Sequence, residues 1–186
     1  MKRLYVCRHG ESKLNALGRY AGQIDTPLTS LGRQQARLAG QQARTLKLDH
    51  IVASPLIRAV ETAQIIAHEV GYPANRITTD VLFLERGLGE LEGKSQKNNP
   101  DDPGLYPGIE PETVLDNRAA NALDYLRGLE ADTVLLVSHG TFLMALSRVL
   151  SDTLSEELPN AFIVEFDLKE TPYAPDYFLN RQPSEI

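Results

Sequence analysis

Short apolar runs bounded by polar or glycine residues recur along the chain, and each has the length of a β-strand. We expect strands at residues 3–7, 50–53 and 133–137, a less regular strand near 77–84, and a last strand at 162–166. The run Thr-Val-Leu-Leu-Val at 133–137 is almost continuously apolar. This pattern is typical of a central parallel strand, both of whose faces are covered.

The segments between these runs have the apolar spacing of amphipathic helices. Helices are expected at residues 31–46, from Ser54 to Gly71, at 112–129 and at 142–150. Because strands and helices alternate, the chain is predicted to form an α/β fold. The predicted architecture is a three-layer sandwich, in which a mostly parallel open sheet carries helices on both faces.

Local signals refine the expected helices. Thr29 or Ser30 should cap the first helix, and Gly40 should weaken its middle. Ser54-Pro55 has the order of a cap followed by a first-turn proline, so it should open the second helix. The residues expected on the apolar sides of the first three helices are Leu31, Leu38 and Leu46; Val60, Ala63, Ala67 and Val70; and Val114, Leu115, Leu123 and Leu126.

Two stretches lack such a pattern. Residues 94–111 are rich in Asn, Asp, Pro and Gly and are expected to form a loop or lid. The segment after residue 170 contains three prolines and should be extended. A chain of 186 residues fits one domain of ordinary size, so residues 1–170 are predicted to form a single domain and 171–186 its C-terminal tail.

Composition and charge limit the classes of partner that are expected. The net charge is −6, and no run of Lys or Arg is present that would bind a phosphate backbone or an anionic membrane. We therefore expect neither nucleic acid nor membrane as a partner. Cys7, the single cysteine, ends an apolar run where a small buried residue is expected. The chain has no signal-peptide pattern and no apolar span of about 18 residues, so a cytoplasmic location is expected.

The candidate chemistry follows the ends of two expected strands. The first strand runs into Arg8-His9-Gly10, and the strand at 133–137 runs into Ser138-His139-Gly140. In open parallel sheets, ligands bind outside the carboxyl ends of the strands. A single histidine would more often be structural. Two His-Gly pairs at strand ends instead predict that His9 and His139 belong to one site.

Positive charge is expected at the same edge of the sheet. Arg58 lies about one turn into the helix that begins at Ser54, and the free N–H groups of that helix should face this edge as well. Together with Arg8, it would form a local positive pocket in an acidic protein. Planar guanidinium groups match the oxygens of a phosphate monoester, which carries roughly one to two negative charges near neutral pH. Glu85 follows the less regular strand and is the carboxyl group best placed to protonate a leaving oxygen.

Five segments, in this order, resemble the histidine phosphatases, or phosphoglycerate mutase-like superfamily. The Arg-His-Gly triplet alone would be a weak signal, but the set is very specific and spans about residues 3 to 166. The segments are Arg8-His9-Gly10-Glu11-Ser12 with Asn15 following, Asp25–Gly32, Ser54–Ala63, Glu85–Gly93 and Val137–Gly140. The resemblance implies that residues 1–170 form a histidine phosphatase-like catalytic domain.

The resemblance also implies a metal-independent phosphoryl transfer, in which His9 attacks phosphorus and becomes a phosphohistidine. His9 must attack as a neutral imidazole, which nearby arginines favour because they disfavour its protonation. A backbone carbonyl should hold the other ring nitrogen as a donor. Arg8, Arg58 and His139 would surround the equatorial oxygens of the group in transfer. Glu85 would protonate the leaving oxygen and then activate water.

Three further expectations concern the surroundings of these groups. Arginines lower the pKa of a nearby carboxyl group, so Glu85 should act as an acid only once a phosphate dianion is bound. Asn15 and the backbone near Gly22 are expected to be supporting contacts to the substrate. Leu91 stands where many phosphatases of the family have tryptophan, and this chain has no tryptophan, so its pocket wall should differ.

The predicted function is hydrolysis of small phosphomonoesters, with no metal or other cofactor and with a small phosphorylated metabolite as partner. The natural substrate and the oligomeric state are left open. A cofactor-primed phosphoglycerate mutase is the main alternative. It is disfavoured because such enzymes carry a long insertion where only 45 residues separate Gly93 from His139. A non-catalytic phosphoryl-ligand sensor is the alternative of another class, and it is disfavoured because His9, Glu85 and both arginines are present.

Overall fold

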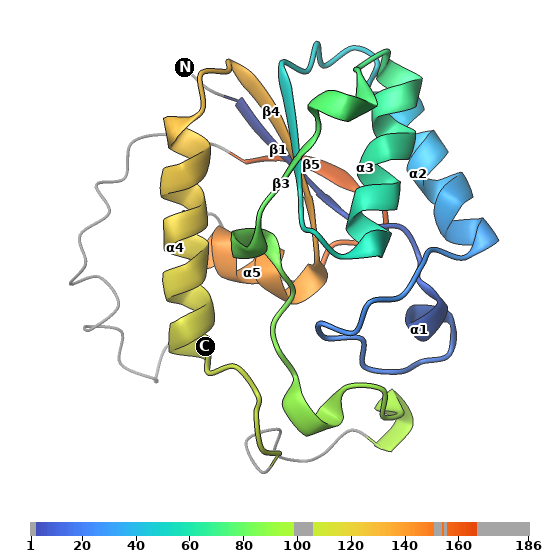
Figure 1. The fold of residues 1–186 in the computed structure, drawn as a ribbon, viewed down its shortest axis with the longest axis vertical. Helices are drawn as coiled ribbons and strands as arrows, with labels where there is room; N and C mark the ends of the chain where they lie inside the picture. Colours follow the sequence, from blue (N-terminus) through green and yellow to red (C-terminus); the bar gives the residue numbers. More distant parts are fainter. Residues whose placement is uncertain (1–2, 99–105, 151–153, 155, 167–186) are drawn as a thin grey trace.

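The sheet at the centre of the molecule has five strands. The computed structural model describes residues 3–98, 106–150, 154 and 156–166. Strand order is β3-β2-β4-β1-β5, and the strands are β1 (Arg3–Arg8), β2 (His50–Ala53), β3 (Thr78–Thr79), β4 (Thr133–Ser138) and β5 (Ile163–Phe166). Helices cover both faces of the sheet (Figure 1). The helices are α1 (Lys13–Ala16), α2 (Ser30–Ala43), α3 (Ile57–Val70), α4 (Glu112–Gly128) and α5 (Gly140–Val149).

The pairing of the strands confirms the predicted architecture. β1, β2, β3 and β4 pair parallel with one another, whereas the edge strand β5 pairs antiparallel with β1. β1 and β4 are adjacent, and Arg8 lies opposite Ser138 in their register. The N–H of His9 donates to the carbonyl of Ser138 at 2.9 Å. The two His-Gly pairs therefore leave the sheet side by side, at the edge where both were expected.

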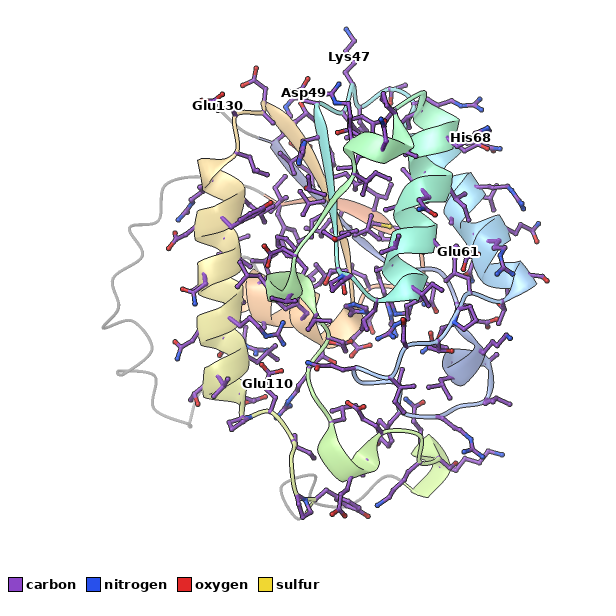
Figure 2. All side chains as sticks on the ribbon, viewed as in Figure 1. Lys47, Asp49, Glu61, His68, Glu110 and Glu130 are labelled. Atoms are coloured by element: carbon purple, nitrogen blue, oxygen red, sulfur yellow. The ribbon has the colours of Figure 1, made fainter. Side chains whose placement is uncertain are left out.

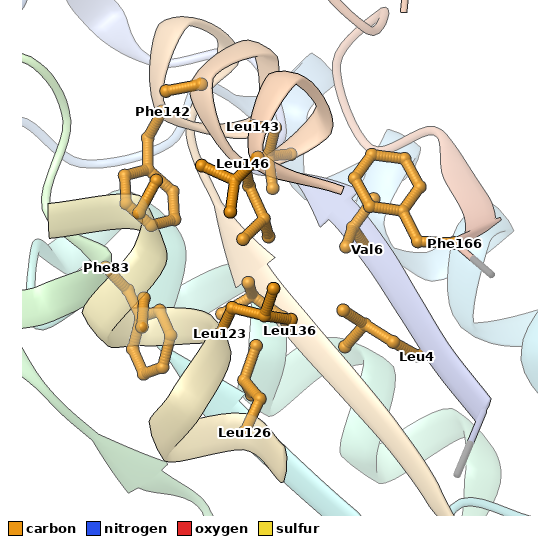
Figure 3. Packing of buried hydrophobic residues seen from close by; sticks show 14 of the residues in the cluster. Leu4, Val6, Phe83, Leu123, Leu126, Leu136, Phe142, Leu143, Leu146 and Phe166 are labelled. Carbon is orange, nitrogen blue, oxygen red and sulfur yellow. The ribbon is translucent and has the colours of Figure 1, made fainter. Parts of the chain in front are cut away.

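Two apolar cores flank the sheet, because successive strand residues point to opposite faces. Leu4 and Val6 of β1 face the α4–α5 side, where they belong to a cluster with Phe142 (Figure 3). Tyr5 and Cys7 face the α2–α3 side and pack in a second cluster. Burial of each such side chain contributes about 1.5–3 kcal/mol, so both layers hold the carboxyl edge of the sheet in place. The predicted burial of Cys7 is confirmed.

The apolar side expected on α2 is wrong for Leu31 and Leu38, whereas Leu46, which lies after the end of the helix at Ala43, packs against the second cluster. Leu31 and Leu38 are 49% and 52% exposed, while the buried positions of the helix are taken by Ala and Gly. α2 packs closely against α3: a Cβ added at Gly40 would lie 2.6 Å from the Cβ of Glu69 and 3.1 Å from the Cα of Ile66. The close contact between the helices selects small residues and turns the leucines outward. Gly40 permits this contact, besides weakening the helix.

The helix expected to begin at Ser54 begins three residues later, at Ile57. Leu56 stands at its N-cap position and makes no side-chain cap; instead the Oδ1 of Asp25 accepts the N–H of Ile57 at 2.7 Å. A residue from another loop thus supplies the cap that Ser54 was expected to provide. The Ser54 side chain accepts the N–H of Leu56 at 3.4 Å, and its contact with a residue of the site is described below.

Other differences are local. The strand expected at 77–84 is reduced to β3, after which a 3₁₀ turn at Val81–Phe83 buries Phe83. The short helix α1 was not predicted. Val114 is 50% exposed, although it was expected on the buried side of α4. The tail at 171–186 and residues 99–105 of the expected loop lie outside the described residues. Within the described part of the chain, no helix is both long and apolar enough to cross a membrane.

Candidate active site

His9 lies at the carboxyl end of β1 and is 3% exposed. Its Nδ1 lies 2.7 Å from the carbonyl oxygen of Gly10. Because a carbonyl can only accept, Nδ1 carries the ring hydrogen, as the predicted contact to a backbone carbonyl requires. Nε2 is therefore the nitrogen with the free lone pair, and it accepts a hydrogen bond from the Nε of Arg58 at 3.1 Å. The ring is held in the tautomer that leaves Nε2 nucleophilic.

Two causes keep the His9 ring neutral. Burial lowers the pKa of His9 well below its ordinary value, and the positive charge of Arg58 lowers it further. The hydrogen bond to Gly10 acts in the opposite direction but is outweighed. The arginines contribute as expected, although burial is the larger cause. The His9 imidazole is therefore neutral at neutral pH, and no neighbouring base has to remove a proton from it.

Arg58 is fully buried in the first turn of α3. Besides the bond to His9, its guanidinium donates to the carbonyls of Ile24 at 2.8 Å and Gly22 at 2.7 Å. Burial lowers the pKa of Arg58 to about 10, while nearby carboxylates raise it, so the group remains charged at neutral pH. Gly22 has φ of 47°, and a Cβ there would lie 2.3 Å from the Oε1 of Glu92. The structure thus places Gly22 behind Arg58, as a support for the guanidinium.

His139 follows β4 and stands at the N-cap position of α5. Its ring centroid lies 5.1 Å from that of His9, with the ring planes at 62°. The Nε2 of His139 lies 2.7 Å from the Oγ of Ser54, and both side chains are fully buried. Burial and the charge of Arg58 lower the pKa of His139 well below its ordinary value. Ser54 therefore orients a second neutral imidazole beside the first.

Arg8 approaches the same place from the end of β1. Its Nη1 donates to the carbonyl of Leu158 at 2.9 Å and lies 3.1 Å from the Oε2 of Glu157. Among the described residues, two buried side-chain nitrogen atoms have no hydrogen-bond partner, and they are Arg8 Nε and His139 Nδ1. An unsatisfied buried polar group costs about 1–3 kcal/mol. Both unpartnered atoms belong to this cluster, where a bound anion would satisfy them.

Glu85 lies at the N-terminus of α5. Its carboxylate accepts the N–H groups of Phe142 at 3.0 Å, Thr141 at 3.3 Å and Arg86 at 2.9 Å. Desolvation raises the pKa of Glu85, and the charge of Glu157 adds to this, outweighing the hydrogen bonds and Arg58. Arg58 does lower this pKa, as expected, but the net lowering expected in the free protein is wrong. Loss of hydration dominates, and it favours the protonated form that an acid catalyst requires.

Comparison with known families decides the identity of this cluster. The model of the histidine phosphatase superfamily (branch 1) matches residues 4–171. The chain belongs to this superfamily. The probable phosphoglycerate mutase GpmB of Enterobacter sp. (strain 638) is 36% identical over 192 residues, which cover 93% of this chain and 88% of the relative.

Two solved structures of the superfamily are similar in fold and sequence. YhfR of Bacillus stearothermophilus is 32% identical, with a TM-score of 0.74 over 90% of this chain and 92% of that one. A mycobacterial glucosyl-3-phosphoglycerate phosphatase, complexed with VO3, is 25% identical, with a TM-score of 0.76 over 89% of this chain and 90% of that one. The relatives of this histidine phosphatase-fold chain are thus phosphatases and mutases, and the chain is an enzyme of that group.

The side chain of Asn15 makes its hydrogen bonds at the start of α1. Its Oδ1 accepts from the N–H and the hydroxyl of Ser12, at 3.1 Å and 2.8 Å. The Ser12 side chain in turn accepts the N–H of Asn15, which completes a capping box at α1. The structure therefore gives the Asn15 oxygen a local role in forming α1. The predicted contact of Asn15 with the substrate stays a prediction.

Two residues of the site were missed at the level of sequence. Thr62 accepts the N–H of Gly10 at 3.0 Å and donates to the carbonyl of Arg58 at 2.7 Å, so it joins β1 to α3. Its position one helical turn after Arg58, in the same motif, was a usable signal. No such signal marks Glu157. It lies in a segment where no helix or strand was expected, and only the folded structure brings it next to Arg8.

A separate cavity of about 610 Å³ lies far from these residues. It is lined by, among others, Lys47, Asp49, Tyr72, Arg76 and Glu130. Asp49 directly precedes β2, so this cavity is at the amino-terminal edge of the sheet, opposite to His9 (Figure 2). The cluster around His9 therefore stands apart from this cavity, and it is identified by its chemistry.

Proposed function

We propose that the chain is a phosphatase that hydrolyses small phosphomonoesters through a phosphohistidine on His9. One observation carries the proposal most directly. The free lone pair of a neutral, buried imidazole lies within hydrogen-bond distance of Arg58, and the unpartnered nitrogens of Arg8 and His139 belong to the same cluster. Such an arrangement combines a nucleophile with fixed donors for the equatorial phosphoryl oxygens.

The first step is attack of His9 Nε2 on phosphorus. The entering phosphoryl group replaces Arg58 as the partner of Nε2, and the Nε of Arg58 then donates to a phosphoryl oxygen while Nη1 and Nη2 keep the carbonyls of Ile24 and Gly22. An N–P bond forms and the P–O bond to the leaving group breaks. Glu85 gives its proton to the departing oxygen, so a neutral alcohol leaves and the Glu85 carboxylate remains.

The second step regenerates the enzyme. The Glu85 carboxylate takes a proton from a water molecule as the water oxygen attacks phosphorus. The N–P bond breaks, inorganic phosphate leaves, and His9 returns as a neutral imidazole. Glu85 ends this step protonated, which is the state that its raised pKa favours. Each group has returned to its starting protonation state.

A phosphoglycerate mutase is the second candidate, because the probable mutase GpmB is 36% identical to this chain. The short interval of 45 residues between Gly93 and His139 favours the phosphatase. The test incubates the purified protein with a phosphoglycerate, with and without a bisphosphorylated primer, and measures released phosphate and isomerised product together. Phosphate release that is independent of primer and insensitive to EDTA supports the proposal. Primer-dependent isomerisation with little phosphate release would assign the mutase instead.

Replacement of Glu157 with glutamine should move the alkaline limb of the kcat/KM profile to lower pH. The charge of Glu157 is one cause of the raised pKa of Glu85, so its removal lowers that pKa. An acid catalyst is active only while protonated, and activity therefore falls at a lower pH once the pKa is lower. The substitution also removes the negative charge beside Nη1 of Arg8, which keeps the carbonyl of Leu158 as a partner, so KM should fall by no more than the few-fold effect of a partly exposed ion pair. A pH–rate series on both proteins checks this, and an unchanged alkaline limb would contradict it.

A further inference from the structure

Arg118 of α4 uses all five N–H donors of its guanidinium. Nη1 donates to the carbonyls of Leu82 at 3.1 Å and Leu84 at 2.6 Å, and Nη2 donates to the carbonyl of Glu85 at 3.2 Å. The remaining bonds go from Nε and Nη2 to the two carboxylate oxygens of Glu110, at 3.0 Å and 2.8 Å. Three of the five acceptors are thus backbone groups of the segment that carries the proposed acid.

Arg118 also contacts the residue that holds the carboxylate of Glu85. The guanidinium carbon lies 5.2 Å from the ring centroid of Phe142. The N–H of Phe142 donates to the Oε1 of Glu85 at 3.0 Å. One side chain therefore acts on Glu85 from two directions, through its backbone carbonyl and through the helix end that orients its carboxylate.

Glu110 fastens the other side of this segment. Its Oε2 accepts the N–H of Gly87 at 3.0 Å, and its own N–H donates to the carbonyl of Gly87 at 2.8 Å. The Nε of Arg86 donates to the carbonyl of Glu110 at 2.8 Å. Figure 2 shows Glu110 beside the first turn of α4. Hydrogen bonds from Arg118 and Gly87, and the nearby arginine charges, outweigh desolvation and lower the pKa of Glu110, so this carboxylate stays ionised at neutral pH.

We propose that Arg118, held by Glu110, is a positioning residue that places the Glu85 carboxyl group against the leaving oxygen of the substrate. The inference rests on the proposed function. A planar guanidinium with five donors in a fixed fork fits this set of acceptors, whereas a lysine ammonium offers three donors in another geometry. A shift of about 1 Å in a catalytic group can lower the rate by roughly 10²-fold.

The test compares two substrates that differ in their need for an acid. The 4-nitrophenolate of 4-nitrophenyl phosphate leaves without protonation, whereas a simple alkyl phosphate needs a proton on its leaving oxygen. Glu85→Gln should lower kcat/KM on the alkyl ester by about 10²-fold to 10⁴-fold and leave the nitrophenyl ester much less affected. Arg118→Lys and Arg118→Met should show the same selective loss, of roughly 10²-fold. Either change should add little in the Glu85→Gln background, because both act through one group.

A matched control is available on the same pair of helices. Arg148 of α5 pairs with Asp116 of α4 at 2.5 Å, and Arg148→Met removes an ion pair similar in kind to that of Arg118. This control should keep the wild-type ratio between the two substrates. Thermal unfolding measurements show whether the arginine variants fold. If they fold poorly, the milder Glu110→Gln replaces them in the test, and it should show the same selective loss at a smaller size.

The outcomes separate this inference from the proposed function. Equal loss on both substrates in the Arg118 and Glu110 variants, alongside a selective loss in Glu85→Gln, would overturn the positioning role and leave the phosphatase standing. No selective loss in Glu85→Gln would remove the acid role of Glu85, and the positioning role with it. Phosphoenzyme formation on His9 tests the proposed function independently of either result.

Discussion

Replacing His9 with alanine should abolish the phosphoenzyme and lower kcat by something on the order of 10⁴-fold to 10⁶-fold, the size seen when a covalent nucleophile is removed. The reason is geometric. Nδ1 is committed to the carbonyl of Gly10, so Nε2 is the one ring atom that can attack. His139 is not expected to take over the attack, because its Nε2 is engaged with Ser54 and its Nδ1 is assigned to the phosphoryl oxygens as a donor. Phosphate release from a chromogenic ester, together with trapping of labelled protein by denaturation at alkaline pH, measures both effects.

His68→Ala is the matched control for this experiment. His68 is an imidazole of the same size, but it is exposed. It lies near the C-terminal end of α3, away from the site (Figure 2). It should keep wild-type turnover and the labelled intermediate. The label itself should be acid-labile and base-stable, as expected for phosphohistidine. A labelled His9→Ala protein with normal turnover would show that the nucleophile lies elsewhere.

The pH dependence of the same reaction follows from the environment of His9. Burial and Arg58 lower the pKa of His9 well below its ordinary value, near 6.5 for a free side chain. The imidazole therefore stays neutral as pH falls through that range, and kcat/KM should show no loss there from protonation of the nucleophile. The same lowered pKa explains why no adjacent carboxylate is needed to activate this histidine.

The centre of the fold and of the site was predictable because both depend on local patterns. The apolar run of β4 identifies a central parallel strand, and β1 beside it brings His9 and His139 within 5.1 Å between ring centroids. Carboxyl ends of parallel strands share one edge, so both strand-end motifs were expected there, while the adjacency of β1 and β4 is a finding of the structure. Arg58 joins them because α3 begins at that same edge.

The buried side of α2 was not predictable from its own sequence. Leucine at positions 31 and 38 has the right spacing for a core stripe, yet Ala36, Ala39 and Gly40 are buried instead. What decides between the two faces is the close approach of α3, where Glu69 leaves no room for a side chain at position 40. The sequence of one helix does not determine how closely a neighbouring helix packs against it.

The electrostatics of Glu85 show the same limit at the site. Counting charges predicted a lowered pKa, whereas desolvation raises it. Burial is a property of the folded chain, and so is the contact that brings Glu157 to Arg8 across 149 positions. The proposed catalytic residues lie in sequence motifs, but the residues that shift their pKa values come from distant segments of the chain.

Replacement of Arg58 with lysine should lower kcat/KM by about 10²-fold to 10³-fold, the size of losing a transition-state donor in a preorganised site. Lysine retains the charge but is a single ammonium group with no fork. It cannot reach the carbonyls of Gly22 and Ile24 while also facing the transferring phosphoryl group. The loss should therefore appear in kcat as well as in KM, and the inhibition constant of inorganic phosphate should rise.

Arg44→Lys supplies the control for this substitution. Arg44 likewise donates through Nε and Nη2, to the carbonyl and carboxylate of Glu69, but its side chain is 59% exposed and remote from His9. The control should leave kcat/KM and phosphate inhibition unchanged, while thermal unfolding of both variants reports any loss of stability. Arg58→Lys with near-normal kcat/KM would show that charge alone suffices at this position. If Arg58→Lys lowered only the thermal stability, Arg58 would be a structural support for the loop at residues 22–24. Its guanidinium would then contribute hydrogen bonds to the fold and none to the phosphoryl group.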